Sequence, residues 1–297
     1  MTKNKGSGDV WIKKHRNNLY LTKSNSLEVE KKLLEYFTSG YPVVLSSGRS
    51  AISMALCYFY KSDVVRVFPF ASQCVVNSIL QAGLTPITPL DYSSLDISYN
   101  QWGRLNANLE HPPFIEDSVD SFYPIHSEIL RSGAEFEVWS LQKIFGLNFG
   151  AVLWCKNESD AKKIREYRDR GSHNLKMLKR VFLRLFKSVH GSIYDHWEKL
   201  EHQHLPLFGL EYGQILERIS IWDNLYNGRK NSYYSALNSL GLVNSTNIED
   251  FREVIPVVIE IPNHIAITSY GNILALHRIV NVKQVTSVSI FPYQVKL

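Results

Sequence analysis

Apolar and polar positions change period along the first half of the chain, from helical spacing to short apolar runs and back. Apolar residues at helical spacing predict helices over 27–37, 50–60 and 72–82. Short apolar runs predict strands over 41–47, 64–68, 85–91, 114–117, 136–140 and 149–155. The last three runs are bounded by turn residues, which is typical of strands buried on both faces. This order predicts an α/β protein with a mainly parallel sheet covered by helices.

The pattern changes twice in the second half of the chain. Helical spacing continues from Ser159 to about Leu240, with a long run over 211–240. After Gly241, strand-like runs at 254–262 and 285–291 flank a segment with helical spacing at 273–280. We therefore predict a large domain over residues 1–205, and a helical connection with a small C-terminal α+β domain over residues 206–297.

Composition narrows the class of protein. The chain has 297 residues, of which 44% are hydrophobic and 21% are charged, so it is long enough and apolar enough to bury a core. Its three cysteines are too few for a disulfide framework, and no apolar run is long enough to span a membrane. The N-terminus has no apolar segment of the signal-peptide kind. We expect a cytoplasmic protein.

Positive charge is concentrated in one stretch, residues 162–187. The whole chain has a net charge of +5, yet this stretch alone holds ten basic residues against two acidic ones. Apolar residues within it fall at helical spacing, so it can be the solvated face of a helix, or a site for a phosphorylated ligand or an anionic lipid surface. Nucleic acid is the least favoured partner because no binding motif accompanies the charge.

Three motifs carry candidate chemistry, and the first is SSGRSAIS at 46–53. There a predicted strand runs through Gly48 directly into a helix. The first N–H groups of a helix point at an approaching anion, and a glycine lets the anion come close, so this junction can bind phosphate. Many strand-turn-helix junctions in α/β proteins share this appearance, so the motif is weak evidence alone.

The second and third motifs follow the next predicted strands. Asp117 ends the strand at 114–117, where it can either face a ligand or cap a helix. Lys143 lies just past the strand at 136–140, three residues after Ser140. A partly buried lysine there is a nucleophile toward carbonyls, although a solvated surface lysine is the ordinary alternative. The Ser-x-x-Lys spacing also matches penicillin-binding enzymes, but their SDN and KTG motifs are absent.

Taken in order, these motifs match the needs of pyridoxal 5′-phosphate (PLP). The cofactor requires a phosphate anchor, an acid beside its pyridine nitrogen and a lysine that forms a Schiff base. Gly48, Asp117 and Lys143 supply these groups, each at the end of a predicted strand. Metal chemistry is less favoured, because His196, His202 and His204 lack the spacing of a helical zinc site.

With these residues in view, the sequence resembles the DegT/DnrJ/StrS-type PLP-dependent sugar aminotransferases, which act on nucleotide-linked keto-sugars. The resemblance runs from about Val43 to Leu240 through the segments SGRSAI, FPFASQCVVNSILQAGLTPITPLD, FIEDSVDS, WSLQKIFGLNFGAVLW and GRKNSYYSALNSL. It implies fold type I, in which a three-layer, mainly parallel sheet forms the large domain and a small α+β domain follows.

The resemblance also implies roles for individual residues. Lys143 would be the Schiff-base lysine and Asp117 the partner of the pyridine nitrogen. The phosphate contacts would be Gly48, Arg49 and Ser140. Asp120 stands where the family usually has Gln or His, which bonds the phenolic oxygen of the cofactor; an ionised Asp120 would repel that oxygen.

Two further departures from the family pattern lead to structural expectations. Near Pro69 the family places an aromatic residue that stacks on the cofactor, whereas this sequence has Ala71, Ser72 and Gln73. Between Asp91 and Pro113 the family has another strand and helix, and this chain is too short there to hold both. The resemblance implies that this shortened stretch borders the cleft where cofactor and substrate would bind.

The resemblance implies an enzyme that transfers an amino group, from glutamate as the expected donor, to a keto-sugar nucleotide in amino-sugar, polysaccharide or secondary-metabolite biosynthesis. It also implies a homodimer with the site between subunits. The alternative is a catalytically impaired member that serves as a ligand-binding or partner-binding subunit. A third reading is a protein that contacts an anionic membrane surface through residues 162–187.

Overall fold

The computed structural model describes residues 23–68, 71–89, 93–100, 109–147, 149–170, 206–239, 257–260, 274–276 and 288–291. The helices are α1 (Ser26–Tyr36), α2 (Gly48–Phe59), α3 (Gln73–Gln81), α4 (Leu141–Phe145), α5 (Glu158–Asp169), α8 (Gly209–Ser220) and α9 (Trp222–Ser239). The strands are β1 (Tyr41–Leu45), β2 (Val64–Arg66), β3 (Thr85–Ile87), β4 (Ile97–Tyr99), β5 (Ile115–Asp117), β6 (Phe136–Ser140), β7 (Ala151–Cys155), β8 (Val257–Glu260), β9 (Leu274–Leu276) and β10 (Val288–Phe291).

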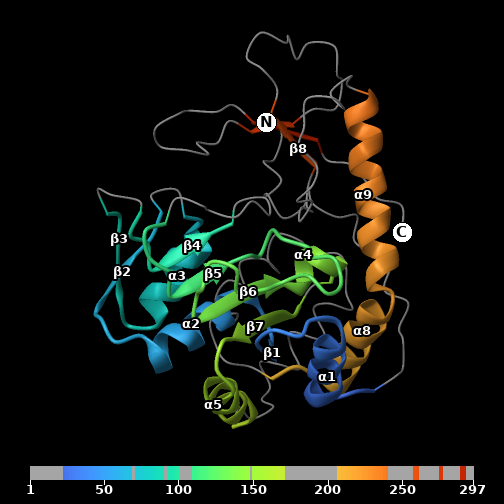
Figure 1. Ribbon diagram of the computed structural model, residues 1–297. Coiled ribbons are helices and arrows are strands. Elements are labelled where there is room, and N and C mark those ends of the chain that lie inside the picture. Colours follow the sequence, from blue (N-terminus) through green and yellow to red (C-terminus); the bar gives the residue numbers. More distant parts are fainter. Residues whose placement is uncertain are drawn as a thin grey trace, which may run out of the picture.

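A five-stranded sheet forms the centre of the molecule, in the order β1-β7-β6-β5-β4 (Figure 1). β7 is antiparallel to both β1 and β6, while β6, β5 and β4 pair in parallel. β1 and β6 therefore run the same way, and β7 alone is reversed. This confirms the α/β class and the mainly parallel sheet, with one antiparallel strand inside it.

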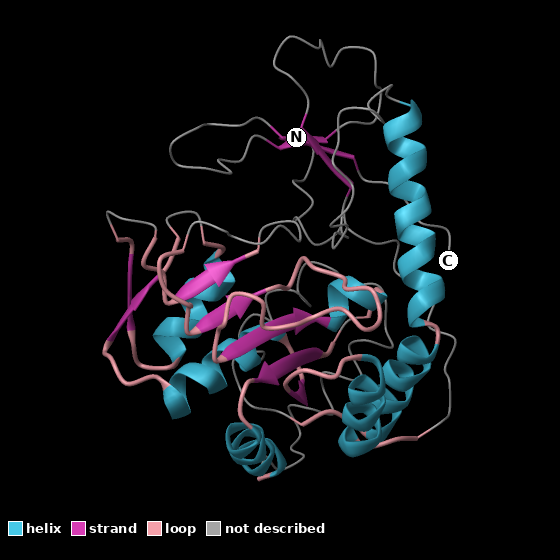
Figure 2. Ribbon diagram, viewed as in Figure 1, coloured by secondary structure: helices cyan, strands magenta, loops and turns pink. Residues whose placement is uncertain are grey.

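Helices cover both faces of this sheet (Figure 2). On one face, α2, α3 and α5 bury apolar residues against alternate side chains of the strands, such as Val43, Val138 and Leu153. On the other, α1, α4, α8 and α9 enclose Val44, Trp139 and Val152. Neighbouring strand residues thus point to opposite cores, which explains why β1 and β7 are apolar along their whole length. The layers are helix, sheet and helix.

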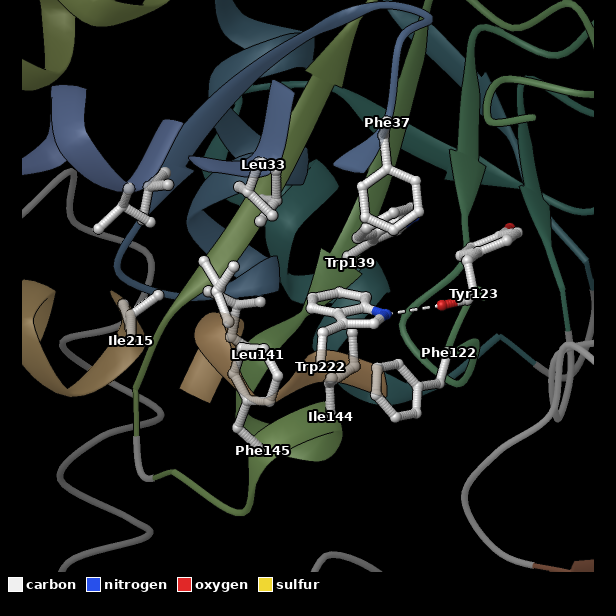
Figure 3. Packing of buried hydrophobic residues seen from close by; sticks show 14 of the residues in the cluster. Leu33, Phe37, Phe122, Tyr123, Trp139, Leu141, Ile144, Phe145, Ile215 and Trp222 are labelled. Atoms are coloured by element: carbon white, nitrogen blue, oxygen red, sulfur yellow. Dashed lines mark hydrogen bonds between the residues drawn. The ribbon is translucent and has the colours of Figure 1, made fainter. Parts of the chain in front are cut away.

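The core beneath α8 and α9 is built from aromatic rings (Figure 3). Trp222, at the start of α9, is fully buried. The centroid of its ring lies 5.3 Å from that of Phe37, the C-cap residue of α1, and 5.4 Å from that of Phe145 of α4. Its indole Nε1 donates a hydrogen bond to the Tyr123 carbonyl at 2.8 Å. A buried tryptophan with its N–H satisfied stabilises a core strongly. Segments distant in sequence are therefore joined at this residue.

Glu30 of α1 is a buried acid that ties three elements together. Its Oε1 accepts from Val44 N at 3.0 Å, and its Oε2 accepts from Arg165 Nε at 2.7 Å. Arg168 of α5 also donates to Oε1. Arg165 and Arg168 therefore point toward Glu30, so the solvated helix face predicted as one alternative for 162–187 does not include these two side chains. Residues 171–187 lie outside the described part of the chain.

The sheet edge near the shortened segment is held by an ion pair. Arg66 of β2 donates to both oxygens of Asp96, from Nε at 3.0 Å and from NH2 at 2.7 Å. Asp96 leads into β4, whose Tyr99 lies opposite Asp117 of β5 in the register. A strand, β4, forms within the shortened stretch between Asp91 and Pro113. It is only three residues long, and its pairing with β5 rather than its own sequence stabilises it.

The C-terminal strands form a separate antiparallel sheet in the order β8-β10-β9. β8 and β10 confirm the strands predicted over 254–262 and 285–291. The helix predicted over 273–280 is wrong, since Leu274–Leu276 is strand β9, paired with β10. A short apolar run cannot be assigned by periodicity alone, and here the pairing with β10 decides. The division at residues 205 and 206 stays a prediction.

Candidate cofactor site

The first motif forms the start of α2, as predicted. Ser47 is the N-cap residue, and its hydroxyl accepts from Ser50 N at 3.2 Å. Gly48 begins the helix and lies beside two valines. Val119 is in the turn after β5, and Val138 is on β6. A Cβ at position 48 would meet them at 3.4 and 3.7 Å, so packing does not demand a glycine here. The helix start therefore lies against the strands that carry the other two motifs.

Asp117 is the last residue of β5 and is 2% exposed. Residues after it form a turn rather than a helix, so the alternative of a helix N-cap is wrong. Its Oδ1 accepts from Val119 N at 3.3 Å. Beside it is a hollow lined by Asp117, Tyr99, Ile97, Val67, Phe68, Ala71, Ser72 and Val75. Phe68 and Tyr99 bring aromatic rings to this hollow, although positions 71–73 have none.

Lys143 lies in the short helix α4, which begins as β6 ends. Ser140 is the N-cap residue, and its Oγ accepts from Lys143 N at 3.4 Å. Gly146 ends the helix with a positive φ of 67°. The side chain of Lys143 is one third exposed, and its Nζ lies 2.6 Å from Oδ1 of Asp120. In Figure 1, α4 lies at the head of the β6 arrow, the edge where parallel strands present ligand-binding residues.

Asp120 connects the lysine to the end of β4. The residue lies in the turn after β5 and is 2% exposed. While Oδ1 pairs with Lys143, Oδ2 accepts a hydrogen bond from the Tyr99 hydroxyl. Tyr99 was not predicted as a site residue, because its strand is short and lies in a polar segment. The only signal in the sequence was an aromatic residue at a strand end.

Burial and charge act in opposite directions on these groups. Burial raises the pKa of Asp117 to about 7; the charge of Lys143 lowers it and that of Asp120 raises it. Burial disfavours the charged form of Lys143, but the charge and hydrogen bond of Asp120 outweigh burial, so the pKa of Lys143 lies above its usual value. The site thus holds Lys143 as an ammonium at neutral pH.

β7 joins the first motif to the lysine motif. Gly150 N, just before β7, donates to the Ser46 carbonyl at 2.7 Å, and its own carbonyl accepts from Leu141 N at 3.0 Å. Gly150 has φ +95°, and a Cβ there would meet Leu141 Cβ at 3.3 Å and Ile215 Cδ1 at 3.2 Å. A glycine is required at this position for both reasons. The ends of β1 and β6 are consequently held together across it.

The structure therefore brings the sequence-predicted residues Gly48, Asp117, Asp120, Ser140 and Lys143 to one edge of the sheet. Arg49 follows Gly48 in the first turn of α2 and is half-buried. His196, His202 and His204 lie outside the described residues. Within the described ranges, no cluster of His, Cys, Asp and Glu suited to a metal is present. The same ranges contain no helix of the length and apolarity that a membrane span needs.

Comparison with known proteins places this geometry in context. The model of a family described as "Putative PLP-dependent aminotransferase" matches residues 29–275. A search of curated proteins finds no significant match.

Solved structures of aminotransferases are similar in fold. Helicobacter pylori PseC, an aminotransferase involved in the biosynthesis of pseudoaminic acid, matches with a TM-score of 0.51 and 14% identity over 73% of this chain and 63% of its own. A DegT DnrJ EryC1 StrS aminotransferase from Brucella abortus matches with a TM-score of 0.49 and 14% identity, over 72% of this chain and 63% of its own. DesV from S. venezuelae matches with a TM-score of 0.49 and 16% identity, over 74% of this chain and 62% of its own. The chain thus spans under two thirds of each, and the likeness to PseC shows the shared fold.

Proposed function

Since the chain belongs to a family of PLP-dependent aminotransferases, we propose that it transfers an amino group from a donor, glutamate, to a keto-sugar nucleotide. The observation that carries this proposal is the placement of Asp117 and Lys143. Asp117 is a buried acid at the end of β5, where it lines the hollow, and Lys143 is a partly exposed amine on α4, just after β6; the two side chains interact electrostatically. These are the two groups that the chemistry of the cofactor requires.

The residues of the site fit this cofactor. Asp117 is buried and accepts a hydrogen bond from the neutral Val119 amide, and a protonated ring nitrogen would supply a cation beside it. Lys143 would hold the carbonyl carbon, and the first turn of α2 at Gly48 and Arg49, with Ser140, would hold the phosphate. Asp120 would face the phenolic oxygen. When bound, PLP withdraws electrons from the carbon that carries the amino group.

Few groups of the protein would take part in the reaction. Lys143 would move a proton to and from the substrate carbon once its amine is released. Asp117 would keep the ring nitrogen charged, and the apolar residues Val67 and Val75 would exclude water from the hollow.

We also propose a homodimer, as the family resemblance implies. Residues 162–187 remain a proposed contact with anionic surfaces; in the described part of this stretch the exposed basic residues are Lys162, Lys163 and Arg170.

Spectroscopy on the purified full chain tests the proposal. Added PLP should produce the visible absorption band of a protein-bound Schiff base. Borohydride should remove the band and leave the reduced cofactor on the Lys143 peptide, as seen by mass spectrometry. Lys143→Ala should show no band, whereas Lys156→Ala, a change at a half-exposed lysine paired with Glu135, should keep it. Absence of a band at saturating PLP would refute the proposal.

A second step separates an enzyme from a binding subunit. Glutamate added to the loaded protein should abolish the Schiff-base band as the amino group passes to the cofactor, and a keto-sugar nucleotide should restore it. A band that glutamate and other amino donors leave unchanged would instead support the catalytically impaired, ligand-binding member of the family.

A further inference from the structure

Asp120 is the point at which the ends of three strands meet through side chains. Its two carboxylate oxygens are used separately: Oδ1 accepts from Lys143 Nζ at 2.6 Å, and Oδ2 accepts from the hydroxyl of Tyr99. Lys143 follows β6, Tyr99 ends β4, and Asp120 lies in the turn after β5 between them. At 2% exposure, the carboxylate has little access to water.

The turn that carries Asp120 is itself held in place. Ser121 N donates to the Ser118 carbonyl at 2.9 Å, which closes the turn. The next residue, Phe122, is fully buried, and the guanidinium of Arg229 lies 4.8 Å from its ring centroid. The same guanidinium donates to the Ile144 carbonyl, one residue beyond Lys143. The acid and the lysine are thus fixed from both sides, so their contact is built into the fold.

The charges around the amine favour an ion pair over a free amine. The titratable groups that act on Lys143 are Asp120 in the turn, Asp117 on β5 and Cys74 on α3, with Tyr99 of β4 reaching it through Asp120. Arg229 of α9 brings a second cation to α4, since its guanidinium donates to the Ile144 carbonyl. A charged ammonium has no lone pair, so it must lose a proton before it attacks a carbonyl.

We propose that Asp120 and Tyr99 are a positioning pair for Lys143: the Asp120 carboxylate holds the ammonium and accepts its proton when the amine reacts, while Tyr99 fixes the carboxylate. In this step one N–H bond of Lys143 breaks, its electron pair stays on nitrogen, and an O–H bond forms on Oδ1. The relevance to catalysis rests on the proposed function, but the ion pair exists without cofactor.

This transfer accounts for an acid at position 120. An ionised carboxylate would repel the negatively charged phenolic oxygen of PLP, as the sequence alone suggested. An Asp120 that has taken the proton from Lys143 presents a hydroxyl, which donates a hydrogen bond instead. The departure from Gln or His then becomes a way to coordinate release of the lysine with acceptance of the cofactor.

Competitive acylation of the cofactor-free protein tests the pair. Acetic anhydride acylates only neutral amines, forming an N–acyl bond with loss of acetate, so labelling against pH gives a midpoint for each lysine. Mass spectrometry reads Lys143 and, within the same sample, Lys156 as the surface reference. In the wild type the Lys143 midpoint should lie above the ordinary value for a lysine. In Asp120→Asn it should fall by about one pH unit, because an opposite charge in contact is lost.

Two further variants make the result decisive. Tyr99→Phe should lower the Lys143 midpoint by a smaller amount, because the carboxylate remains but is less well fixed. Asp63→Asn, at an exposed bend before β2, should leave it unchanged. Equal Lys143 midpoints in the wild type, Asp120→Asn and Tyr99→Phe would overturn the proposal. If Asp120→Asn does not fold, the comparison of the Lys143 midpoints in Tyr99→Phe and Asp63→Asn decides the question, and equal values there would also overturn it. Failure here leaves the test with PLP and glutamate untouched, since no cofactor is used.

Discussion

At the scale of single residues, Asp117 shows how a functional group can work against the stability of the fold. Burial raises its pKa from 3.8 to about 7. An acid whose pKa is higher in the folded than in the unfolded state favours folding most when both states are protonated. Its contribution is therefore complete at pH values below about 4, and is lost as the pH rises through about 7.

We expect Asp117→Asn to remove this pH dependence from the cofactor-free protein. Between acidic and mildly alkaline pH, the free energy of unfolding of the wild type should fall relative to that of the variant by about 2–4 kcal/mol, at about 1.4 kcal/mol per pKa unit. Urea unfolding at a series of pH values measures it. The variant should also bind PLP more weakly, because the ring nitrogen loses its anionic partner.

Asp63→Asn, a substitution of an exposed residue, is the control for this comparison. It should retain the wild-type slope of stability against pH, since its carboxylate is solvated. If stability depends on pH equally steeply in Asp117→Asn and in the wild type, ionisation of Asp117 does not destabilise the folded protein. Bound cofactor should offset the cost in the wild type by giving Asp117 a cation.

At the scale of elements, the lysine helix α4 depends on the residue that precedes β7. Gly150 has φ +95° and lies against Leu141, the first residue of α4. Gly83, after α3, has φ +78°, but a Cβ there would meet nothing within 4 Å. The two glycines therefore share the backbone conformation and differ in packing.

Gly150→Ala should destabilise the protein by about 2–4 kcal/mol, the sum of backbone strain and overpacking. Gly83→Ala should cost only the backbone share, about 1 kcal/mol. Urea unfolding of both variants measures the difference. Equal losses would show that the contact of Gly150 with Leu141 and Ile215 yields without cost, and that α4 is not held by this packing.

At the scale of the whole molecule, Trp222 links the start of α9 to α1, α4 and the loop at Tyr123. Replacing it with Ala would leave a large cavity and an unpaired carbonyl, so we expect a loss of about 3–5 kcal/mol in the free energy of unfolding. Because the rings it contacts come from distant segments, these segments should unfold in one transition.

Ile221→Ala is the matched control, since Ile221 is the preceding residue and is 36% exposed. It should cost less than about 1 kcal/mol. Thermal unfolding followed by near-ultraviolet circular dichroism reports on the aromatic core directly. A Trp222→Ala protein as stable as Ile221→Ala would show that α9 is not an integral part of this core.

The sequence by itself determined three helices and most of the strands of the first half, the α/β class and the order of the three site motifs. These follow from local pattern: hydrophobic period, turn residues, and the rule that parallel strands present their ends at one edge. Gly48, Asp117 and Lys143 could be found in this way, because each follows a predicted strand.

Only the tertiary structure decided the short elements and the partners of charged groups. β4 and β9 are three residues long and exist through pairing with distant strands. Arg165 and Arg168 point to Glu30, and Tyr99 to Asp120, across separations that local pattern does not record. Burial makes these pairings strong, and burial is set by which segments the fold brings together rather than by the residues alone.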